Sequence, residues 1–174
     1  MRRLLLQALM QGPMTEASPA ADATSLEDLA RKLSEAGRLR LGRSLSIREV
    51  DAGSCNGCEL EIHALSNPYY DLERFGLRFV ASPRHADVLL VTGPVSNNMK
   101  MALERTWQAT PAPKWMVALG DCAAGCGVFQ ESAACAGGVA AVLPVDLAIK
   151  GCPPSPTEIL KGLLALLEEN ASAR

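Results

Sequence analysis

The stretch DVLLVTG, residues 87–93, is a short, uninterrupted apolar run that ends in glycine. A second run of the same kind, KWMVALG, follows at residues 114–120, and LRFVAS precedes both at residues 77–82. Runs of this length without polar alternation are typical of strands buried on both faces of a parallel sheet. A fourth segment, SLSIREV at residues 44–50, alternates briefly and also indicates a strand.

Helical segments separate and follow these strands. They cover residues 58–65, ahead of an Asn-Pro pair, residues 97–109, and residues 155–170. The alternation of strand and helix predicts an α/β fold with a doubly wound, mostly parallel sheet. In such a sheet the loops that follow the strands meet at the carboxyl edge, where these folds bind their ligands.

The chain ahead of the first strand has a different character. Residues 5–10 place their leucines and methionine on one helical face, which predicts a short amphipathic segment. Residues 12–24 are rich in Pro, Ala and Ser and predict a linker, whereas residues 25–37 open with an N-cap serine and close with glycine, as a helix does. We therefore expect a helical extension over residues 1–43 and one α/β domain over residues 44–174.

The N-terminus superficially resembles an export signal, because Arg2 and Arg3 precede an apolar stretch. Gln7 and Gln11 interrupt that stretch, and no window approaches the roughly 20 apolar residues of a membrane span. We expect a peripheral protein on the cytoplasmic face of the inner membrane that is not exported. The amphipathic segment then either packs on the chain's own core or docks against a membrane partner.

The composition and charge of the chain exclude some classes of function. The 174 residues are 48% apolar, enough for one domain with a substantial core. With 17 basic and 19 acidic side chains and only 4% aromatics, the chain lacks the basic surface and stacking platforms that nucleic-acid binding requires. Because an unexported chain sits in a reducing compartment, its six cysteines are expected to be ligands rather than disulfides.

Four cysteines follow predicted strands in glycine- or proline-rich loops. Cys55 and Cys58 lie in GSCNGC, Cys122 lies in GDCAAGCG, and Cys152 lies in KGCPPSP. Four converging thiolates can hold zinc or a [4Fe–4S] cluster, and a CxxC pair can also be a redox dithiol. Structural zinc sites usually take two close pairs of ligands, whereas this set is one pair and two singles. The spacing therefore favours the bulkier cluster and leaves the other two interpretations open.

Two cysteines remain outside this set. Cys126 and Cys135 lie among small residues, where a free cysteine packs as a small hydrophobe, although Cys126 is near enough to Cys122 to be a rival ligand. Six cysteines cannot supply the eight thiolates of two all-cysteine cubanes. We expect one cluster.

At this point the motifs show a family resemblance. In order along the chain, four blocks resemble the 20 kDa subunit of respiratory complex I and its relatives, the small subunits of membrane-bound [NiFe] hydrogenases. The blocks are GSCNGCELEI, ASPRHADVLLVTGPVSNNM, ALGDCAAGCGVF and VLPVDLAIKGCPPSPTEIL. The resemblance covers about residues 44–168. It implies a flavodoxin-like domain and one [4Fe–4S] cluster held by Cys55, Cys58, Cys122 and Cys152.

The first of these blocks indicates which branch of the family the chain resembles. Complex I subunits carry two adjacent cysteines there, whereas Cys55 and Cys58 are separated and followed by Glu59, as is typical of the hydrogenase branch. The chain most resembles the small subunit of energy-converting, formate hydrogenlyase-type hydrogenases. It departs from the family at Cys126, which stands where the family has the first of two glycines after the third ligand.

The resemblance implies an electron-transfer subunit that is not catalytic alone, because its only CxxC pair is already used and no nickel ligand set remains. Its implied partners are a [NiFe] large subunit similar to the complex I 49 kDa subunit, a ferredoxin-like iron–sulfur subunit and integral membrane subunits. The alternative is a quinone-reductase subunit, in which Arg84 and Met99 fall in a block that lines the quinone cavity. Met99 and Met101 are otherwise explained as helix core. A zinc-stabilised scaffold is the third interpretation.

Several polar residues near the motifs have simpler explanations. His63 and His85 are separate from the cysteine loops and are expected to be ordinary hydrogen-bonding residues. Glu59 and Glu61 open a helix, where acidic side chains suit the helix dipole. Because Glu59 is next to Cys58, it is also a candidate for tuning the cluster or passing protons.

Overall fold

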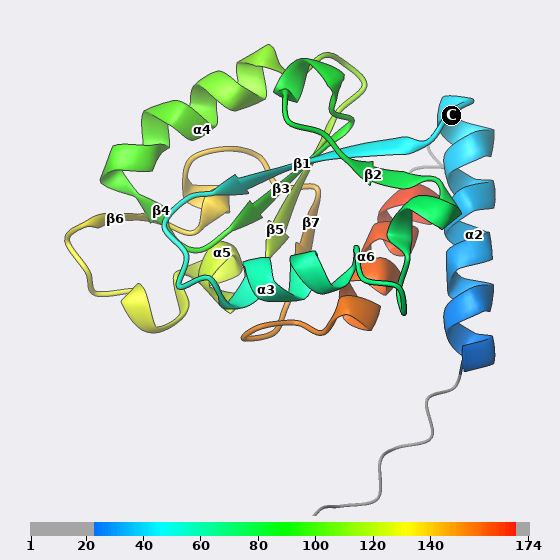
Figure 1. Cartoon of the computed structure of the whole chain (residues 1–174). Helices are drawn as coiled ribbons and strands as arrows, with labels where there is room; N and C mark the ends of the chain where they lie inside the picture. Colours follow the sequence, from blue (N-terminus) through cyan, green and yellow to red (C-terminus); the bar gives the residue numbers. More distant parts are fainter. Residues whose placement is uncertain (1–22, 170–174) are drawn as a thin grey trace, which may run out of the picture.

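The computed structural model describes residues 23–169 of the chain (Figure 1). Five parallel strands form the central sheet in the order β2-β1-β3-β5-β7. They are β1 (Leu45–Asp51), β2 (Leu77–Phe79), β3 (Val88–Thr92), β5 (Trp115–Leu119) and β7 (Leu147–Ile149). Counted along the chain within this sheet, the order is 2-1-3-4-5, the flavodoxin-like arrangement. The predicted α/β, doubly wound parallel fold is confirmed.

Helices cover both faces of the sheet (Figure 1). One face packs against α2 (Ala23–Leu41), α3 (Gly57–Ala64) and α6 (Pro156–Glu169), and the other against α4 (Asn97–Ala109) and α5 (Asp121–Gly125). No helix among residues 23–169 is long and apolar enough to cross a membrane.

Short elements complete the chain between the helices and strands. Strands β4 (Val95–Ser96) and β6 (Cys135–Gly137) pair antiparallel in a small second sheet. The single-turn helices are η1 (Leu72–Phe75), η2 (Pro83–His85), η3 (Gly127–Phe129) and η4 (Val139–Ala141).

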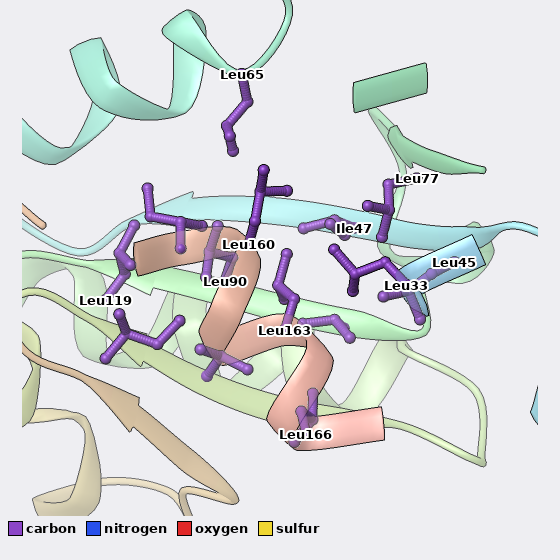
Figure 2. Packing of buried hydrophobic residues seen from close by; sticks show 14 of the residues in the cluster. Leu33, Leu45, Ile47, Leu65, Leu77, Leu90, Leu119, Leu160, Leu163 and Leu166 are labelled. Carbon is purple, nitrogen blue, oxygen red and sulfur yellow. The ribbon is translucent and has the colours of Figure 1, made fainter. Parts of the chain in front are cut away.

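The larger hydrophobic cluster lies between the sheet and helices α2, α3 and α6. Alternate residues of β1, Leu45 and Ile47, point into it together with Leu90 of β3, and α6 covers them with Leu160 and Leu163 (Figure 2). Each fully buried leucine or isoleucine contributes about 1.5–3 kcal/mol relative to an exposed one. This layer fixes the strands whose carboxyl ends carry the cysteine loops.

The second cluster covers the opposite face of the sheet. Leu89 and Val91 of β3 and Met116 of β5 point into it, and Leu103 of α4 packs over them. All five residues of β3 and all five of β5 are buried. Continuous apolar runs therefore predicted both central strands correctly, because each contacts helices on both sides of the sheet.

Helix α2 is longer than predicted. We expected a linker through residue 24 and a helix over residues 25–37, but α2 runs from Ala23 to Leu41. Gly37 lies inside α2 and is buried, and the turn that ends the helix falls at Gly42, whose φ is +66° and whose N–H donates to the Arg38 carbonyl over 2.9 Å. The contacts of α2 with α6 extend the helix past the first glycine. The predicted amphipathic segment lies outside the described residues.

An ion pair fixes the amino edge of the sheet. Asp87, almost completely buried ahead of β3, accepts hydrogen bonds from the guanidinium of Arg43 and, over 2.9 Å, from the backbone N–H of Ser46 in β1. The carboxylate thereby joins the starts of two neighbouring strands. This edge is opposite the one that carries the cysteine loops.

Candidate functional site

Three loops bring cysteines to the carboxyl edge of the sheet. Cys55 and Cys58 follow β1, Cys122 lies in α5 directly after β5, and Cys152 follows β7. Because β1, β5 and β7 run parallel in one sheet, these loops emerge on the same side, as the sequence predicted.

Backbone contacts join the three loops to one another. The N–H of Asp121 donates to the Gly151 carbonyl, and the N–H of Gly151 donates to the Asp121 carboxylate, both over 2.9 Å. This reciprocal pair ties the Cys122 loop to the Cys152 loop. The Cys58 Sγ lies 3.8 Å from the Leu119 carbonyl at the end of β5, so the first loop reaches the second.

The four thiols act on one another electrostatically. Burial, and then the charges of Glu59 and of the thiols at Cys55, Cys122 and Cys152, raise the pKa of Cys58 to about 12. Burial, and then Cys152 and Cys55, raise the pKa of Cys122. The charges of Cys55 and Cys152 therefore reach both Cys58 and Cys122, and a donor set of this kind is stabilised by a cationic metal core, because metal ligation holds cysteines as thiolates.

Glycines leave room beside three of the sulfurs. A Cβ at Gly57 would lie 3.5 Å from the Cys55 Sγ, one at Gly120 would lie 2.7 Å from the Cys58 Sγ, and one at Gly127 would lie 2.9 Å from the Cys122 Sγ. The last two distances are shorter than real Cβ contacts allow. The backbone thus forms a cradle that larger residues would fill, which fits a group bulkier than one side chain.

The thiols also differ in exposure. Cys55 and Cys152 are exposed, whereas Cys58 and Cys122 are half-buried. Within residues 23–169, no three side chains of His, Cys, Asp or Glu are arranged to hold a single metal ion. The donor set, the glycine cradle and the mutual electrostatics of the four thiols fit an all-cysteine iron–sulfur cluster.

Cys126 and Cys135 are outside the four-cysteine set, and Cys126 lies beside it, because its N–H donates to the Cys122 carbonyl over 2.8 Å. Cys126 ends α5, is 5% exposed and has φ +69°, a left-handed conformation that is uncommon for any residue except glycine. The motif resemblance implies glycine at this position, and the backbone has the left-handed conformation that glycine favours. Cys135 is half-buried at the start of β6.

Sequence reasoning named Glu59, next to Cys58, but missed two polar residues on the same face of the sheet, Glu49 and Thr92. Glu59 is 8% exposed, and neither of its carboxylate oxygens has a hydrogen-bond partner. On the same face of the sheet lie Thr92, whose hydroxyl is also buried without a partner, and Glu49. Burial first, and then Glu59, raise the pKa of Glu49, whereas His63 lowers it. The alternating pattern of residues 44–50 could have predicted the burial of Glu49, because it places Glu49 on the same face of the strand as Ile47.

The other polar candidates occupy separate places. His63 is exposed in the last turn of α3, and Glu61 is half-buried in the same helix. His85 and Arg84 are exposed in η2, which precedes β3 and so lies toward the amino end of the sheet. Met99 is half-buried in the first turn of α4, whereas Met101 in the same helix is 57% exposed, so the interpretation of Met101 as helix core is wrong.

The comparisons with known proteins agree on one family. Residues 55–166 match the family model of the NADH ubiquinone oxidoreductase 20 kDa subunit. A probable membrane-bound hydrogenase subunit, mbhJ, of Pyrococcus furiosus is 47% identical over 75% of this chain and 78% of its own length. Formate hydrogenlyase subunit 7 of Escherichia coli is 44% identical over 78% of this chain and 54% of its own length.

Solved structures extend the agreement to the fold. A chain of the archaeal membrane-bound sulfane sulfur reductase, a respiratory membrane complex, superposes with a TM-score of 0.66 at 32% identity, covering 80% of this chain and 76% of that one. A chain of an NAD⁺-reducing [NiFe]-hydrogenase shares the fold, with a TM-score of 0.56 at 19% identity over 73% of this chain and 93% of that one. The chain therefore belongs to the family of the NADH ubiquinone oxidoreductase 20 kDa subunit, among the small subunits of membrane-bound hydrogenases and complex I-like assemblies, as its motifs predicted.

Proposed function

We propose that Cys55, Cys58, Cys122 and Cys152 hold one [4Fe–4S] cluster and that the chain is the electron-transfer subunit of a membrane-bound hydrogenase complex. The convergence of three loops at one edge of the sheet, where the charges of Cys55 and Cys152 act on Cys58 and Cys122, is the observation that carries the proposal. When bound, such a cluster accepts and donates single electrons at a potential set by its surroundings.

The residues of this chain have definite parts in that task. The four thiols give up their protons on ligation, and a cationic metal core would offset the burial and the neighbouring negative charges that raise the pKa of Cys58 and Cys122. Gly120 and Gly127 keep the space next to two of the sulfurs free of side chains. Asp121 locks the second loop to the third, so that the spacing of their sulfurs is fixed before ligation.

The surface around the cysteine loops supports a role within a complex. Three large apolar side chains near the cysteines face solvent: Leu60 is 61% exposed, Val128 is 89% exposed and Phe129 is 39% exposed. Exposed apolar groups beside oxidation-sensitive thiols require cover. We assign this cover to a [NiFe] large subunit similar to the complex I 49 kDa subunit, with a ferredoxin-like iron–sulfur subunit and integral membrane subunits completing the complex.

The proposed location is peripheral, on the cytoplasmic face of the inner membrane. In this proposal residues 44–174 form the iron–sulfur domain and residues 1–43 an extension that helps attach it. Deleting residues 1–11 should leave the cluster signal intact and release the subunit from membranes during a salt wash. A processed N-terminus recovered from the periplasm would contradict this location.

A quinone-reductase subunit is the second candidate, favoured by the matching family model. Hydrogen oxidation by the intact complex, measured with an artificial electron acceptor, separates the two functions, because only a nickel-containing partner supports it. A complex that reduces quinone but never oxidises hydrogen would replace the first proposal by the second.

The ligand set is tested by single cysteine-to-alanine variants of the intact complex. Each change at Cys55, Cys58, Cys122 or Cys152 should abolish the paramagnetic signal of the reduced cluster or convert it to a three-iron signal. Cys126→Ala is the matched control, because it removes a neighbouring thiol of the same loop. If Cys126→Ala lost the cluster while Cys122→Ala kept it, the assignment would be wrong. Stoichiometric zinc in place of iron would instead support a structural scaffold.

A further inference from the structure

The amino edge of the sheet carries a pocket that the proposed function does not use. Its volume is about 230 Å³, and it lies between the C-terminal half of α2, the start of β1 and the turn from η1 into β2. We propose that this pocket binds a phosphate-class anion, either a free phosphate monoester or the phosphate of a lipid headgroup. The side chains that line it are Ser34, Arg38, Arg43, Ser44, Glu73 and Arg74.

Positive charge dominates this lining. Three arginines stand against one carboxylate, that of Glu73, so the lining carries two net positive charges. The negative end of the α2 dipole would favour a basic residue at Arg38, which lies near the C-terminus of that helix. It does not account for Arg43 and Arg74, which belong to other segments. Arginines that come to one pocket from three separate segments are typical of anion recognition.

Buried and surface carboxylates orient two of these arginines without filling the pocket. Two nitrogens of the Arg43 guanidinium donate to the two oxygens of Asp87, whose side chain is 3% exposed, whereas that of Arg43 is 52% exposed. A guanidinium has five N–H donors, so Arg43 retains donors for a second acceptor. The Nε of Arg74 lies 3.6 Å from the Asp71 carboxylate in a solvent-exposed pair. Such pairs are weak, so this one does not prevent Arg74 from binding an anion.

Two hydroxyl groups add donors to the same wall of the pocket. A Cβ at Gly76 would lie 3.6 Å from the Ser34 Oγ and 3.7 Å from the Ser44 Oγ, so α2 and the start of β1 bring both hydroxyls to one position. Gly76 itself lines the pocket, and its φ of +78° is a left-handed conformation that favours glycine. Each hydroxyl can donate one hydrogen bond to an anion, and the missing side chain at Gly76 leaves room for it.

The number of donors and the size of the pocket favour phosphate over a carboxylate. A planar carboxylate is bound by one or two guanidinium groups, whereas a phosphate presents three strong acceptor oxygens and suits donors on several sides. The volume is far above the roughly 10–15 Å³ that one water needs and below the roughly 300 Å³ at which pockets for drug-sized ligands begin. It therefore fits a phosphate and a small part of the molecule that carries it. Glu73 favours ligands whose remaining part is neutral or cationic.

The test uses the full chain, with the subunits that accompany it on purification, and radiolabelled inorganic phosphate as the probe in equilibrium dialysis at constant ionic strength. Arg38→Gln and Arg74→Gln should each weaken phosphate binding about tenfold or more, because each removes a charge-assisted hydrogen bond. Arg31→Gln is the matched control, since it removes the same charge from α2 at a residue that pairs with Asp28 and does not line the pocket. It should leave phosphate binding unchanged, and thermal unfolding verifies that each variant is folded.

Competition tests the proposal without any substitution. Sulfate, which is also tetrahedral, should displace the phosphate, whereas acetate at the same concentration should not. The source of the phosphate is then distinguished with glycerol phosphate and with vesicles. Flotation with vesicles of phosphatidylcholine and phosphatidic acid, but not of phosphatidylcholine alone, would assign a lipid headgroup if Arg38→Gln abolished it. Displacement by glycerol phosphate without flotation would assign a free phosphate ester.

Three results would overturn the proposal. They are the absence of phosphate binding, equal displacement by acetate and sulfate, and equal weakening by Arg31→Gln and Arg38→Gln. The first would also be the outcome if an acidic segment of a partner subunit filled the pocket. The pocket lies at the edge of the sheet opposite the cysteine loops, so this proposal stands independently of the proposed function.

Discussion

Replacing Gly120 by alanine should prevent cluster binding with limited damage to the fold. Gly120 has φ 90° and ψ 161°, a region of backbone conformation that is essentially confined to glycine. Forcing alanine into it costs about 1–3 kcal/mol. For a domain of this size that corresponds to a fall in Tm of roughly 2–12 °C.

The effect on the site is larger, because the new Cβ would stand 2.7 Å from the Cys58 Sγ, where ordinary contact begins at 3.4 Å. Without metal, the Cys58 thiol can rotate away at little cost. With a cluster bound, the sulfur must stay within about 0.2 Å of its bonding distance from iron, so a displacement several times larger breaks that bond. We therefore expect a folded protein with strongly reduced iron content.

The assay compares iron content, the paramagnetic signal of the reduced cluster and thermal unfolding in three variants. Gly125→Ala is the matched control within the same loop, because no heavy atom lies within 4 Å of its added Cβ. Gly42→Ala measures the cost of the left-handed backbone conformation alone, because Gly42 has φ +66° and an added Cβ there would meet no heavy atom within 4 Å. Both controls should keep full iron. A Gly120→Ala variant that binds iron as the unsubstituted chain does would refute the assignment of Cys58 as a ligand in this geometry.

Two further predictions concern stability away from the cysteines. Arg43→Ala should lower the free energy of unfolding in urea by about 2–3 kcal/mol, because it leaves the Asp87 carboxylate buried with only the Ser46 N–H as a hydrogen-bond donor. Loss of an exposed surface ion pair costs at most about 1 kcal/mol. A change of less than about 0.5 kcal/mol would contradict the proposed role of this ion pair. Hydrogen bonds from the backbone N–H and the hydroxyl of Ser155 hold the pKa of Glu158 below its usual 4.5. Its stabilising effect is therefore present above the unfolded-state pKa and lost as pH falls through the lower folded-state pKa. Glu158→Gln should remove that part of the acid dependence of unfolding, and an unchanged acid profile would contradict it.

The sequence predicted what depends on local pattern. Uninterrupted apolar runs identified β3 and β5, since a strand with helices on both sides needs apolar residues at every position. The glycine-rich loops after the strands identified where the cysteines meet, because parallel topology alone brings those loops to one edge.

What the sequence left unpredicted depends on contacts between distant segments. Gly37 signalled the end of a helix, but packing of α2 against α6 carried the helix on to Leu41. The placement of Gly138 against the carbonyl oxygens of Ala123 and Ala124 in α5 is likewise a contact that no local pattern reveals. The Glu59 carboxylate is buried without a hydrogen-bond partner because of how α3 packs on the sheet, and this too depends on contacts between distant segments.

The distribution of the cysteines over three strands also constrains biosynthesis. The last of them in sequence, Cys152, follows β7, and its loop reaches the others only after β7 has paired with β5. During translation the complete set of four thiols therefore exists only after all five strands of the central sheet have been synthesised. A group bound by all four thiols links segments that are far apart in the sequence. A disulfide that closes a loop of roughly 15 to 100 residues stabilises the folded state by about 3–5 kcal/mol, and each link through the bound group is expected to act in the same way. Delivery of iron and sulfide is thus expected to follow folding, and the apoprotein is the form that assembly factors should recognise.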